Sequence, residues 1–346
     1  MGRFTKFLIL ALVACSAEAA LRPEQLAVII NDADPNSVAV GEYYIERRGI
    51  PAENVVRARF AYDKPVLSSA AFKRVYDDVR VRTPKSIQAY ALTWTNPIRV
   101  NCMSITTAFA MGYGTRHCAK GCRAIAPSPY FNSHSQHPYS DHNIRPTMSI
   151  AARTVENAKR VIDRGVQSDG RHPQAAAYFV ITTDAARNSR SPAFHAAKRE
   201  LGRAIPITIA HANAIRDRFD IMFYFTGATH VPHLDSIGFL PGAMADHLTS
   251  AGGRLMNSPQ MSALRWLEAG ATGSYGTVVE PCNFPQKFPN PAIAMAHYLA
   301  GDTLVEAYWK SVVWPGQGIF IGEPLARPYA VSTGVEPGDT GATEHE

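Results

Sequence analysis

The sequence has 346 residues, of which 46% are hydrophobic and 18% charged, and this composition is typical of a globular protein with a large core. The formal charge is +6 at pH 7. Residues 1–19 contribute +1 and residues 331–346 contribute −4, so residues 20–330 carry +9. This basic body lacks runs of Lys and Arg and lacks interleaved Arg and aromatic residues, so we expect no nucleic-acid partner.

The first residues, "MGRFTKFLILALVACSAEAA", are typical of an export signal, because basic residues precede an apolar stretch and then small residues. Ala17-Glu18-Ala19 fits the small-x-small rule of ordinary signal peptidase. "LVAC", ending at Cys15, resembles a bacterial lipobox, which would make Cys15 a lipid-anchored first residue. Both alternatives predict an exported protein that is periplasmic, an outer-membrane lipoprotein or secreted. No later apolar run is long enough to predict a transmembrane span.

Strand and helix patterns alternate along the rest of the chain. Short apolar or β-branched runs predict strands at 25–30, 54–60, 86–94, 175–183, 219–227, 271–280 and 318–322. Helical spacing predicts helices at 35–48, 68–82, 148–165, 192–201, 259–270 and 292–312. We therefore expect one α/β domain over residues 20–330. Its sheet is mainly parallel, with helices on both faces, as a caspase-like or Rossmann-like three-layer sandwich.

Two segments depart from this pattern. Residues 95–147 are rich in Pro, Ser, Asn, Tyr and His, which predicts an irregular insertion tied by disulfides. The acidic tail, residues 331–346, has the composition of a disordered segment. Four cysteines remain after either cleavage, which in an oxidising compartment suggests two disulfides. Cys118 and Cys122 are close enough to pair with each other, which would leave Cys102 with Cys282.

Polar residues follow most of the predicted strands. In a parallel sheet the carboxyl ends of the strands share one edge, where ligands bind. We interpret this edge as a site with candidate catalytic residues Asp32, Asp184, Glu280 and His230 and candidate ligand-binding residues Asn31, Asn96, Arg99, Arg187 and Asn188. The competing explanation is that Asp and Asn cap helices and form turns at such positions. Asp34 with Pro35 is fully explained as an N-cap and first helical residue.

Histidine clusters and a cysteine are further candidate reactive groups. Two stretches, "SHSQHPYSDH" and "THVPHLD", contain candidate zinc ligands, but neither matches H-E-x-x-H, and we predict no metal site. Cys282 follows a strand and could act as a thiolate nucleophile with His230 or His233 as base, although a structural disulfide is the favoured outcome. No motif identifies a cofactor.

Several long stretches resemble an uncharacterised family of exported bacterial proteins found together with exosortase protein-sorting systems. The similar stretches are "NDADPNSVAVGEYYIERRGIP", "RPTMSIAARTVENAKRVIDRG", "TDAARN", "GAMADHLTSAGG", "GATGSYGTVVEPCNFPQKFP" and "AYWKSVVWPGQGIFIGEPLARP". The resemblance runs from about Leu21 to Tyr329 and implies export, but no activity.

A partial resemblance links the C-terminal half to gingipain-like, caspase-fold cysteine peptidases, in which His-Gly follows one strand and the Cys nucleophile follows the next. The corresponding places here read Thr226-Gly227-Ala228-Thr229-His230 and Leu248-Thr249-Ser250-Ala251-Gly252. The histidine is displaced and Ser250 stands where a Cys is needed. "AMADHLTSAGG" also reads as a helix ended by Gly252-Gly253, which would remove the analogy.

Two functions follow from these patterns. The first is a hydrolase-like enzyme whose acidic site lies at the carboxyl edge of the sheet, with general acid–base chemistry by carboxylates and an imidazole. The second is a non-catalytic envelope binding protein with a degenerate peptidase-like fold, which holds a ligand or an envelope protein linked to surface-protein sorting.

Overall fold

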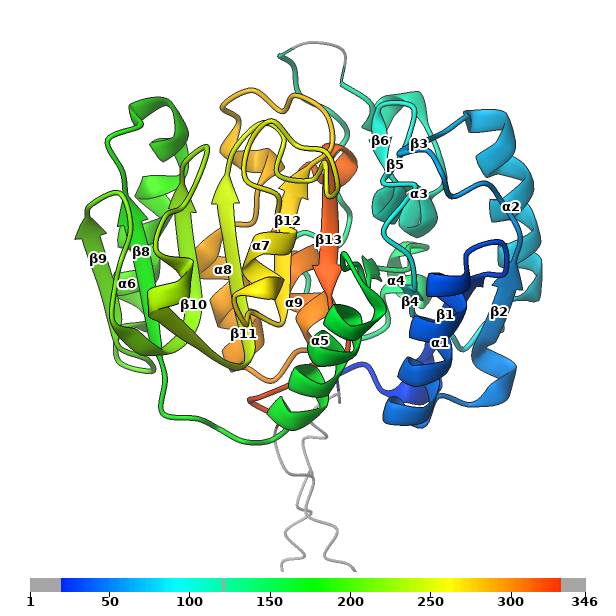
Figure 1. Cartoon of the computed structure of the whole chain (residues 1–346), viewed down its shortest axis with the longest axis horizontal. Coiled ribbons are helices and arrows are strands. Elements are labelled where there is room, and N and C mark those ends of the chain that lie inside the picture. The colour runs from blue at the N-terminus through cyan, green and yellow to red at the C-terminus, as the bar shows by residue number, and fades with distance from the viewer. Residues whose placement is uncertain (1–19, 120–121, 331–346) are drawn as a thin grey trace, which may run out of the picture.

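The computed structural model describes residues 20–119 and 122–330 (Figure 1). The predicted signal peptide, the lipobox cysteine and the acidic tail lie outside these residues. The strands are β1 (Leu26–Asn31), β2 (Val55–Ala58), β3 (Val66–Leu67), β4 (Ala89–Leu92), β5 (Arg99–Val100), β6 (Met103–Ser104), β7 (Thr147–Ser149), β8 (Ala176–Ile181), β9 (Ile207–His211), β10 (Arg218–Gly227), β11 (Ile237–Leu248), β12 (Gly273–Thr277) and β13 (Gly318–Gly322). The helices are α1 (Pro35–Arg48), α2 (Ser69–Arg82), α3 (Ile105–Met111), α4 (Pro138–His142), α5 (Val155–Ser168), α6 (Ser191–Leu201), α7 (Leu264–Glu268), α8 (Pro291–Leu299) and α9 (Leu304–Lys310).

Ten strands form one mostly parallel sheet in the order β2-β1-β4-β7-β13-β12-β11-β10-β8-β9. β2, β1, β4 and β7 run parallel to one another, and so do β12, β11, β10, β8 and β9. β13 runs antiparallel to β12 and bridges to β7. β3, β5 and β6 form a separate small sheet, two strands of which lie within residues 95–147. The predicted α/β class with a mainly parallel sheet is confirmed.

Helices cover both faces of the sheet, because alternate strand residues point to opposite sides (Figure 1). In β1, Val28 and Ile30 belong to the core cluster that contains Tyr44 of α1, whereas Ala27 and Ile29 belong to the cluster that contains Phe72 of α2. The same arrangement of helices on opposite faces is found at the β9 end of the sheet. Phe179 of β8 stacks on Phe194 of α6, while Tyr224 of β10 packs edge-on against Trp266 of α7.

Glu323, directly after β13, shows how the two halves of the sheet are aligned. Its backbone N–H donates to the carbonyl of Thr272, which precedes β12. Its fully buried carboxylate accepts hydrogen bonds from Tyr44 (2.8 Å) and Arg48 (3.0 Å) at the far end of α1. Because α1 returns from the carboxyl end of β1 to its amino end, the amino ends of β1 and β12 lie at one edge of the sheet. At the opposite edge, Asp34 after β1 and Met256 after β11 line one cavity, so the carboxyl ends of these two strands lie together.

Several local expectations are confirmed and others are wrong. Asp34 caps α1 by accepting a hydrogen bond from the Asn36 amide, and Gly49 ends that helix in the left-handed conformation at φ 60°. The predicted helix at 148–165 is wrong at its start, since Met148 lies in β7 and α5 begins only at Val155. The alternative helix over "AMADHLTSAGG" is also wrong, because residues 237–248 form β11. That strand is buried from Gly242 onward, which masks strand alternation in the sequence.

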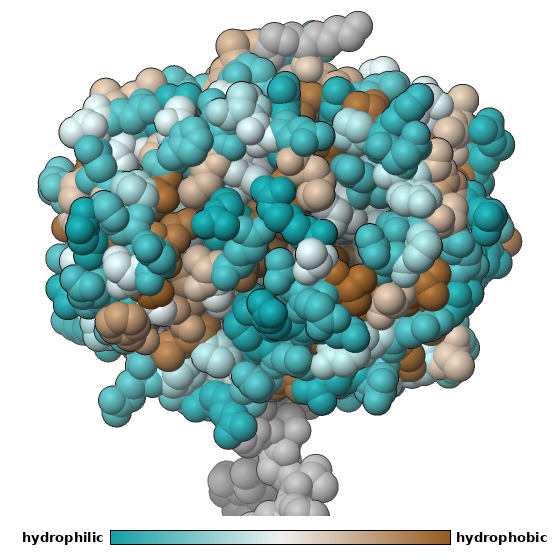
Figure 2. Space-filling model, in the orientation of Figure 1, coloured by the Kyte–Doolittle hydropathy of each residue, from teal (hydrophilic) through white to brown (hydrophobic). Residues whose placement is uncertain are grey.

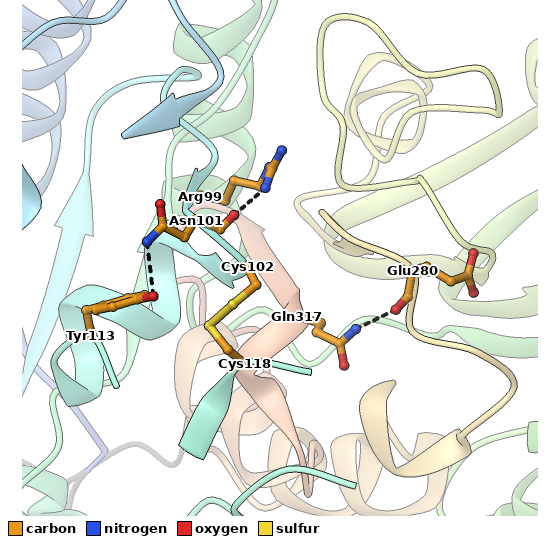
Figure 3. The surroundings of a disulfide bond; sticks show 7 residues. All are labelled: Arg99, Asn101, Cys102, Tyr113, Cys118, Glu280 and Gln317. Carbon is orange, nitrogen blue, oxygen red and sulfur yellow. Dashed lines mark hydrogen bonds between the residues drawn. A yellow bond between two sulfur atoms is a disulfide. The ribbon is translucent and has the colours of Figure 1, made fainter. Parts of the chain in front are cut away.

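The predicted number of disulfides, two, is confirmed, but the cysteines pair differently from what the sequence suggested. Cys102 pairs with Cys118 (Figure 3). Cys122 pairs with Cys282. The short sequence distance between Cys118 and Cys122 favoured a local loop, yet the fold brings each to a different partner. Cys282 is thus held in a disulfide, so the hypothesis that it is a thiolate nucleophile is wrong. Among the described residues, no helix is long and apolar enough to cross a membrane.

We expect the buried Arg48–Glu323 pair to dominate the stability of this edge. Glu323→Gln leaves the buried Arg48 guanidinium with only the partly exposed Asp169 as counter-charge, so it should lower the free energy of unfolding by about 3 kcal/mol. Asp77→Asn, which breaks the exposed Lys73–Asp77 pair on α2, should change it by about 1 kcal/mol or less. Urea unfolding of both variants checks this. Equal small losses would show that the buried pair contributes no more than a surface one.

The two disulfides should contribute unequally. The Cys122–Cys282 bond joins residues 160 positions apart and the Cys102–Cys118 bond residues 16 apart. A cross-link that closes a longer loop restricts the unfolded chain more, by about 5 against about 3 kcal/mol in the chain-entropy model. The double Cys→Ser variant at 122 and 282 should therefore unfold at lower urea concentration than the one at 102 and 118. Peptide mapping without reduction should recover these two pairs, and a Cys118–Cys122 peptide would contradict the connectivity.

Candidate functional site

Two cavities lie side by side over the carboxyl edge of the sheet and share Arg153 and Met256 in their walls. The smaller, of about 140 Å³, lies between the first turns of α1 and α5. The larger, of about 560 Å³, lies between the segment after β10 and the loop 249–263 after β11. We call the two together the edge groove. Figure 2 shows a largely hydrophilic face with small groups of hydrophobic residues between polar ones.

The smaller cavity receives the amino ends of two 14-residue helices. Asp34 and Asn36 line it from α1, and Thr154 and Val155 from α5. The Thr154 hydroxyl caps α5 by accepting a hydrogen bond from an amide in its first turn. Helix amino ends carry partial positive charge and free N–H groups, which favour an anion. The smaller cavity therefore combines the partial positive charge of two helix amino ends with the carboxylate of Asp34, which is already engaged as the cap of α1.

Arg153 adds a full positive charge where the two cavities meet. Its Nε lies 2.9 Å from Oε1 of Glu268, and Arg265 pairs with the other oxygen of the same carboxylate. One carboxylate thus serves two guanidiniums, so its charge does not neutralise both. The Arg153 side chain remains 40% exposed, which leaves it free to contact a ligand.

The larger cavity has a wall that is held in place without a ligand. The Gln260 side-chain oxygen accepts hydrogen bonds from the Thr249 hydroxyl (2.8 Å) and the Ala251 amide (2.8 Å). Ser258 donates to the Ala251 carbonyl at 2.8 Å. These bonds fold the loop 249–263 back on itself, so the groove is preorganised rather than formed by the ligand.

His247 is buried in β11 and holds this loop in place through a hydrogen bond. Its Nδ1 accepts a hydrogen bond from the indole of Trp266 (2.9 Å), and its Nε2 donates to the carbonyl of Met261 (3.0 Å). Burial lowers the pKa of His247 to about 3, so the imidazole is neutral and keeps this tautomer. It has a structural role, because both ring nitrogens are occupied. His230, by contrast, is exposed and lines the larger cavity.

The three candidate carboxylates do not meet in the edge groove; none of them lines either cavity. Asp32 pairs with Arg57 of β2 at 2.8 Å. Asp184 caps the short helix Ala185–Arg190 and pairs with Arg187 at 2.6 Å. Glu280 accepts a hydrogen bond from the amide of Cys282 at 2.8 Å, and its backbone carbonyl accepts one from Gln317 (Figure 3). Each carboxylate therefore has a structural partner of its own.

The candidate ligand-binding residues divide in the same way. Asn31 is buried and exchanges two hydrogen bonds with the backbone of Phe60, and Asn188 bonds the backbone of Thr182. Arg187 donates to the Thr249 hydroxyl besides pairing with Asp184.

Arg99 donates to the carbonyl of Asn101, whose side chain bonds Tyr113 (Figure 3). Burial, with the nearby charge of Arg254, lowers the pKa of Arg99. Asn96 alone of these residues lines the smaller cavity.

The positions expected from the peptidase resemblance follow two neighbouring strands. Gly227 at the end of β10 is paired with Leu248 at the end of β11, so the segments containing His230 and Ser250 begin side by side. His230 lines the larger cavity, but Ser250 does not. No cluster of His, Cys, Asp or Glu in the described part of the chain is arranged to hold a metal ion.

Sequence reasoning missed Arg153, Met256 and Gln260, which line the edge groove. Arg153 could have been found, since it precedes a Thr that begins a helix and follows a short apolar run. Treating residues 148–165 as a single helix hid that strand end. Met256 and Gln260 carry no local signal: Gln260 lies in the predicted helix 259–270, and Met256 follows a strand, β11, that no sequence pattern predicts.

Comparisons with known proteins give little direction. No protein-family model and no curated protein matches this chain. A solved structure described as "Structure of Protease" is 10% identical; the likeness covers 88% of this chain and 78% of that chain, with a TM-score of 0.45.

We expect Asp184 to stabilise the fold as a helix cap. Asp184→Ala removes the cap and the ion pair and should lower the free energy of unfolding by about 1–2 kcal/mol. Asp184→Asn keeps a capping oxygen and should cost clearly less, since Asn caps as well as Asp. Urea unfolding of the two variants checks the order. Equal losses for both would show that the cap does not contribute.

Proposed function

We propose that this chain is a non-catalytic binding protein of the cell envelope that holds a polar, anionic ligand in the edge groove. The observation that carries the proposal is Arg153, which lies beside the amino ends of α1 and α5 in a cavity that already exists. Two helix amino ends and a partly exposed guanidinium together favour a carboxylate or phosphate group. The larger cavity, with His230, Ser258 and Gln260 in its walls, offers hydrogen bonds to the rest of the ligand.

The state of the carboxylates supports binding over hydrolysis. A carboxylate that acts in general acid–base catalysis must lie within hydrogen-bond reach of a bound substrate. Asp32, Asp184 and Glu280 are each engaged elsewhere, and none of them lines the edge groove. Two other carboxylates do line it, Asp34 and Asp235, and Asp34 is already engaged as the cap of α1. The hydrolase hypothesis retains one supporting observation, the paired ends of β10 and β11, which begin the His230 and Ser250 segments side by side.

The setting of the protein supports an extracytoplasmic ligand. Two disulfides are typical of exported proteins, and the first residues have the pattern of an export signal. The resemblance to proteins found with exosortase systems makes a sorted surface protein, or a polymer attached to it, the expected source of the anionic group.

Anion binding should depend on Arg153. Citrate and inorganic phosphate should raise the melting temperature of the wild-type protein in low salt, and Arg153→Gln should reduce that rise at least severalfold. The matched control is Arg199→Gln on the exposed face of α6, which removes the same charge far from the groove and should leave the rise unchanged. Differential scanning fluorimetry over a concentration series measures the effect.

Two outcomes would contradict the proposal. Equal shifts in Arg153→Gln and wild type would show that the anions bind elsewhere. Turnover of ester or peptide substrates that Ser250→Ala abolishes would establish the hydrolase alternative instead.

A further inference from the structure

A fully buried carboxylate, Glu306, lies where the described chain begins. It is the third residue of α9, and its Oε2 accepts hydrogen bonds from the amide (3.0 Å) and hydroxyl (2.6 Å) of Thr303, the residue that caps the helix. The same oxygen accepts a hydrogen bond from the amide of Leu21 at 3.2 Å. The other oxygen, Oε1, is buried and has no hydrogen-bond partner among residues 20–119 and 122–330. Helix capping thus uses only half of this carboxylate.

Two buried carboxylates, Asp302 and Glu306, share one lysine. Asp302 accepts hydrogen bonds from Lys310 (2.7 Å) and His297 (3.0 Å). Lys310 is fully buried and is directed to Asp302 and to the ring of Tyr130. With His297 neutral, an ionised Glu306 carries a negative charge that no lysine or arginine of the described residues pairs with. A buried charge without a partner is costly, so a further cation at Oε1 would stabilise the cluster.

The chain itself can supply this cation. Ala20 and Leu21 are each only 3% exposed, so the start of the described chain is packed into the protein. The Leu21 amide already bonds Glu306, and the Ala20 nitrogen is one residue further, within about 3.8 Å along the backbone. The preceding residues, Ala17-Glu18-Ala19, have the small-x-small pattern that signal peptidase cleaves. Cleavage there would make Ala20 the first residue.

We propose that processing between Ala19 and Ala20 creates an α-ammonium group that pairs with the buried carboxylate of Glu306. The peptidase of the export machinery hydrolyses this one peptide bond: water supplies the hydroxyl group to Ala19, which leaves as a carboxylate, and the released Ala20 amine becomes protonated. The new positive charge balances Glu306 and gives Oε1 a donor. The processed N-terminus is then a structural part of the fold, independent of the edge groove. Processing at Cys15 would leave residues 15–19 attached and provide no amine here.

The pairing predicts a change in how stability depends on pH. Burial and the nearby Asp302 carboxylate raise the pKa of Glu306 to about 7, and the Lys310 ammonium and the hydrogen bonds from Thr303 limit the rise. The other groups that face the cluster are His297 of α8 and Tyr130. In a chain without the ammonium, stability is highest below the ordinary pKa of Glu, about 4.3, and is lost as pH rises to about 7. With the ammonium present, the pKa of Glu306 falls and this loss disappears.

The test compares two disulfide-bonded proteins, one beginning at Ala20 after tag removal and one beginning at Ser16. Thermal unfolding from pH 4.5 to 8 should give equal melting temperatures at the acid end and a melting temperature several degrees higher for the Ala20 form at pH 7–8. Glu306→Gln in both backgrounds should abolish the difference, whereas Glu200→Gln on the surface should retain it. A difference that persists in Glu306→Gln would overturn the proposal.

A second measurement needs no variant. Intact mass and N-terminal sequencing of the exported protein should give Ala20 as the first residue. The α-amine should be acetylated at least tenfold more slowly in the folded than in the unfolded protein, because it is buried and paired. A lipidated Cys15 as first residue, or an α-amine that reacts as fast as in the unfolded chain, would rule the pairing out. Neither readout involves anion binding, so failure here leaves the groove proposal standing, and the reverse also holds.

Discussion

The buried contact between Glu323 and Arg48 fixes the geometry on which the rest of the structure depends. Glu323 directly follows β13, the strand that runs antiparallel to β12, and its backbone N–H donates a hydrogen bond to the carbonyl of Thr272, the residue before β12. A β-carbon on Gly165 of α5 would lie 2.2 Å from the Glu323 carboxylate, so α5 can approach only because that residue is a glycine. The carboxylate thus holds β13, α1 and α5 at one edge of the sheet. The opposite edge, where the strands end, is left for the edge groove.

The carboxyl edge shows how one residue type serves both structure and binding. Asp, Asn and Thr follow the strands because a chain that turns from strand to helix needs oxygen atoms for free amide groups. Asp34, Thr154 and Asp184 all do so. A side chain that caps a helix has its oxygen engaged by a backbone amide, but the cap also fixes the residue at which the helix begins. Two of those beginnings lie beside Arg153 and line the smaller cavity, where helix amino ends carry partial positive charge. The anion binding that we propose therefore depends on the positions of the helices more than on the residues that cap them.

Much of the fold follows from local patterns. The α1 boundaries at Pro35 and Gly49, and β13 at 318–322, could be predicted because caps, a proline and an apolar run act over a few residues. β11 could not, since most of it is buried on both faces and contains Pro and Gly, so neither alternation nor composition marks it as a strand. The disulfide partners could not be predicted either. Cys118 is four positions from Cys122 but bonded to Cys102, a pairing that only the packing of residues 95–147 selects.

The sequence by itself determined the α/β class, the alternation of strands with helices, the residues that begin α1, and the set of cysteines that pair, because these depend on hydrophobic periodicity, turn chemistry and composition. The tertiary structure alone decided which polar residues meet. It paired Asp32 with Arg57 of β2 and brought Arg153, which precedes α5 in the sequence, to the amino end of α1. Asp184 and Glu280, by contrast, bond residues only two or three positions away. The physical reason is that a side chain's partners depend on strand order and helix direction across the whole sheet, and contacts between residues far apart in the chain leave no local signal.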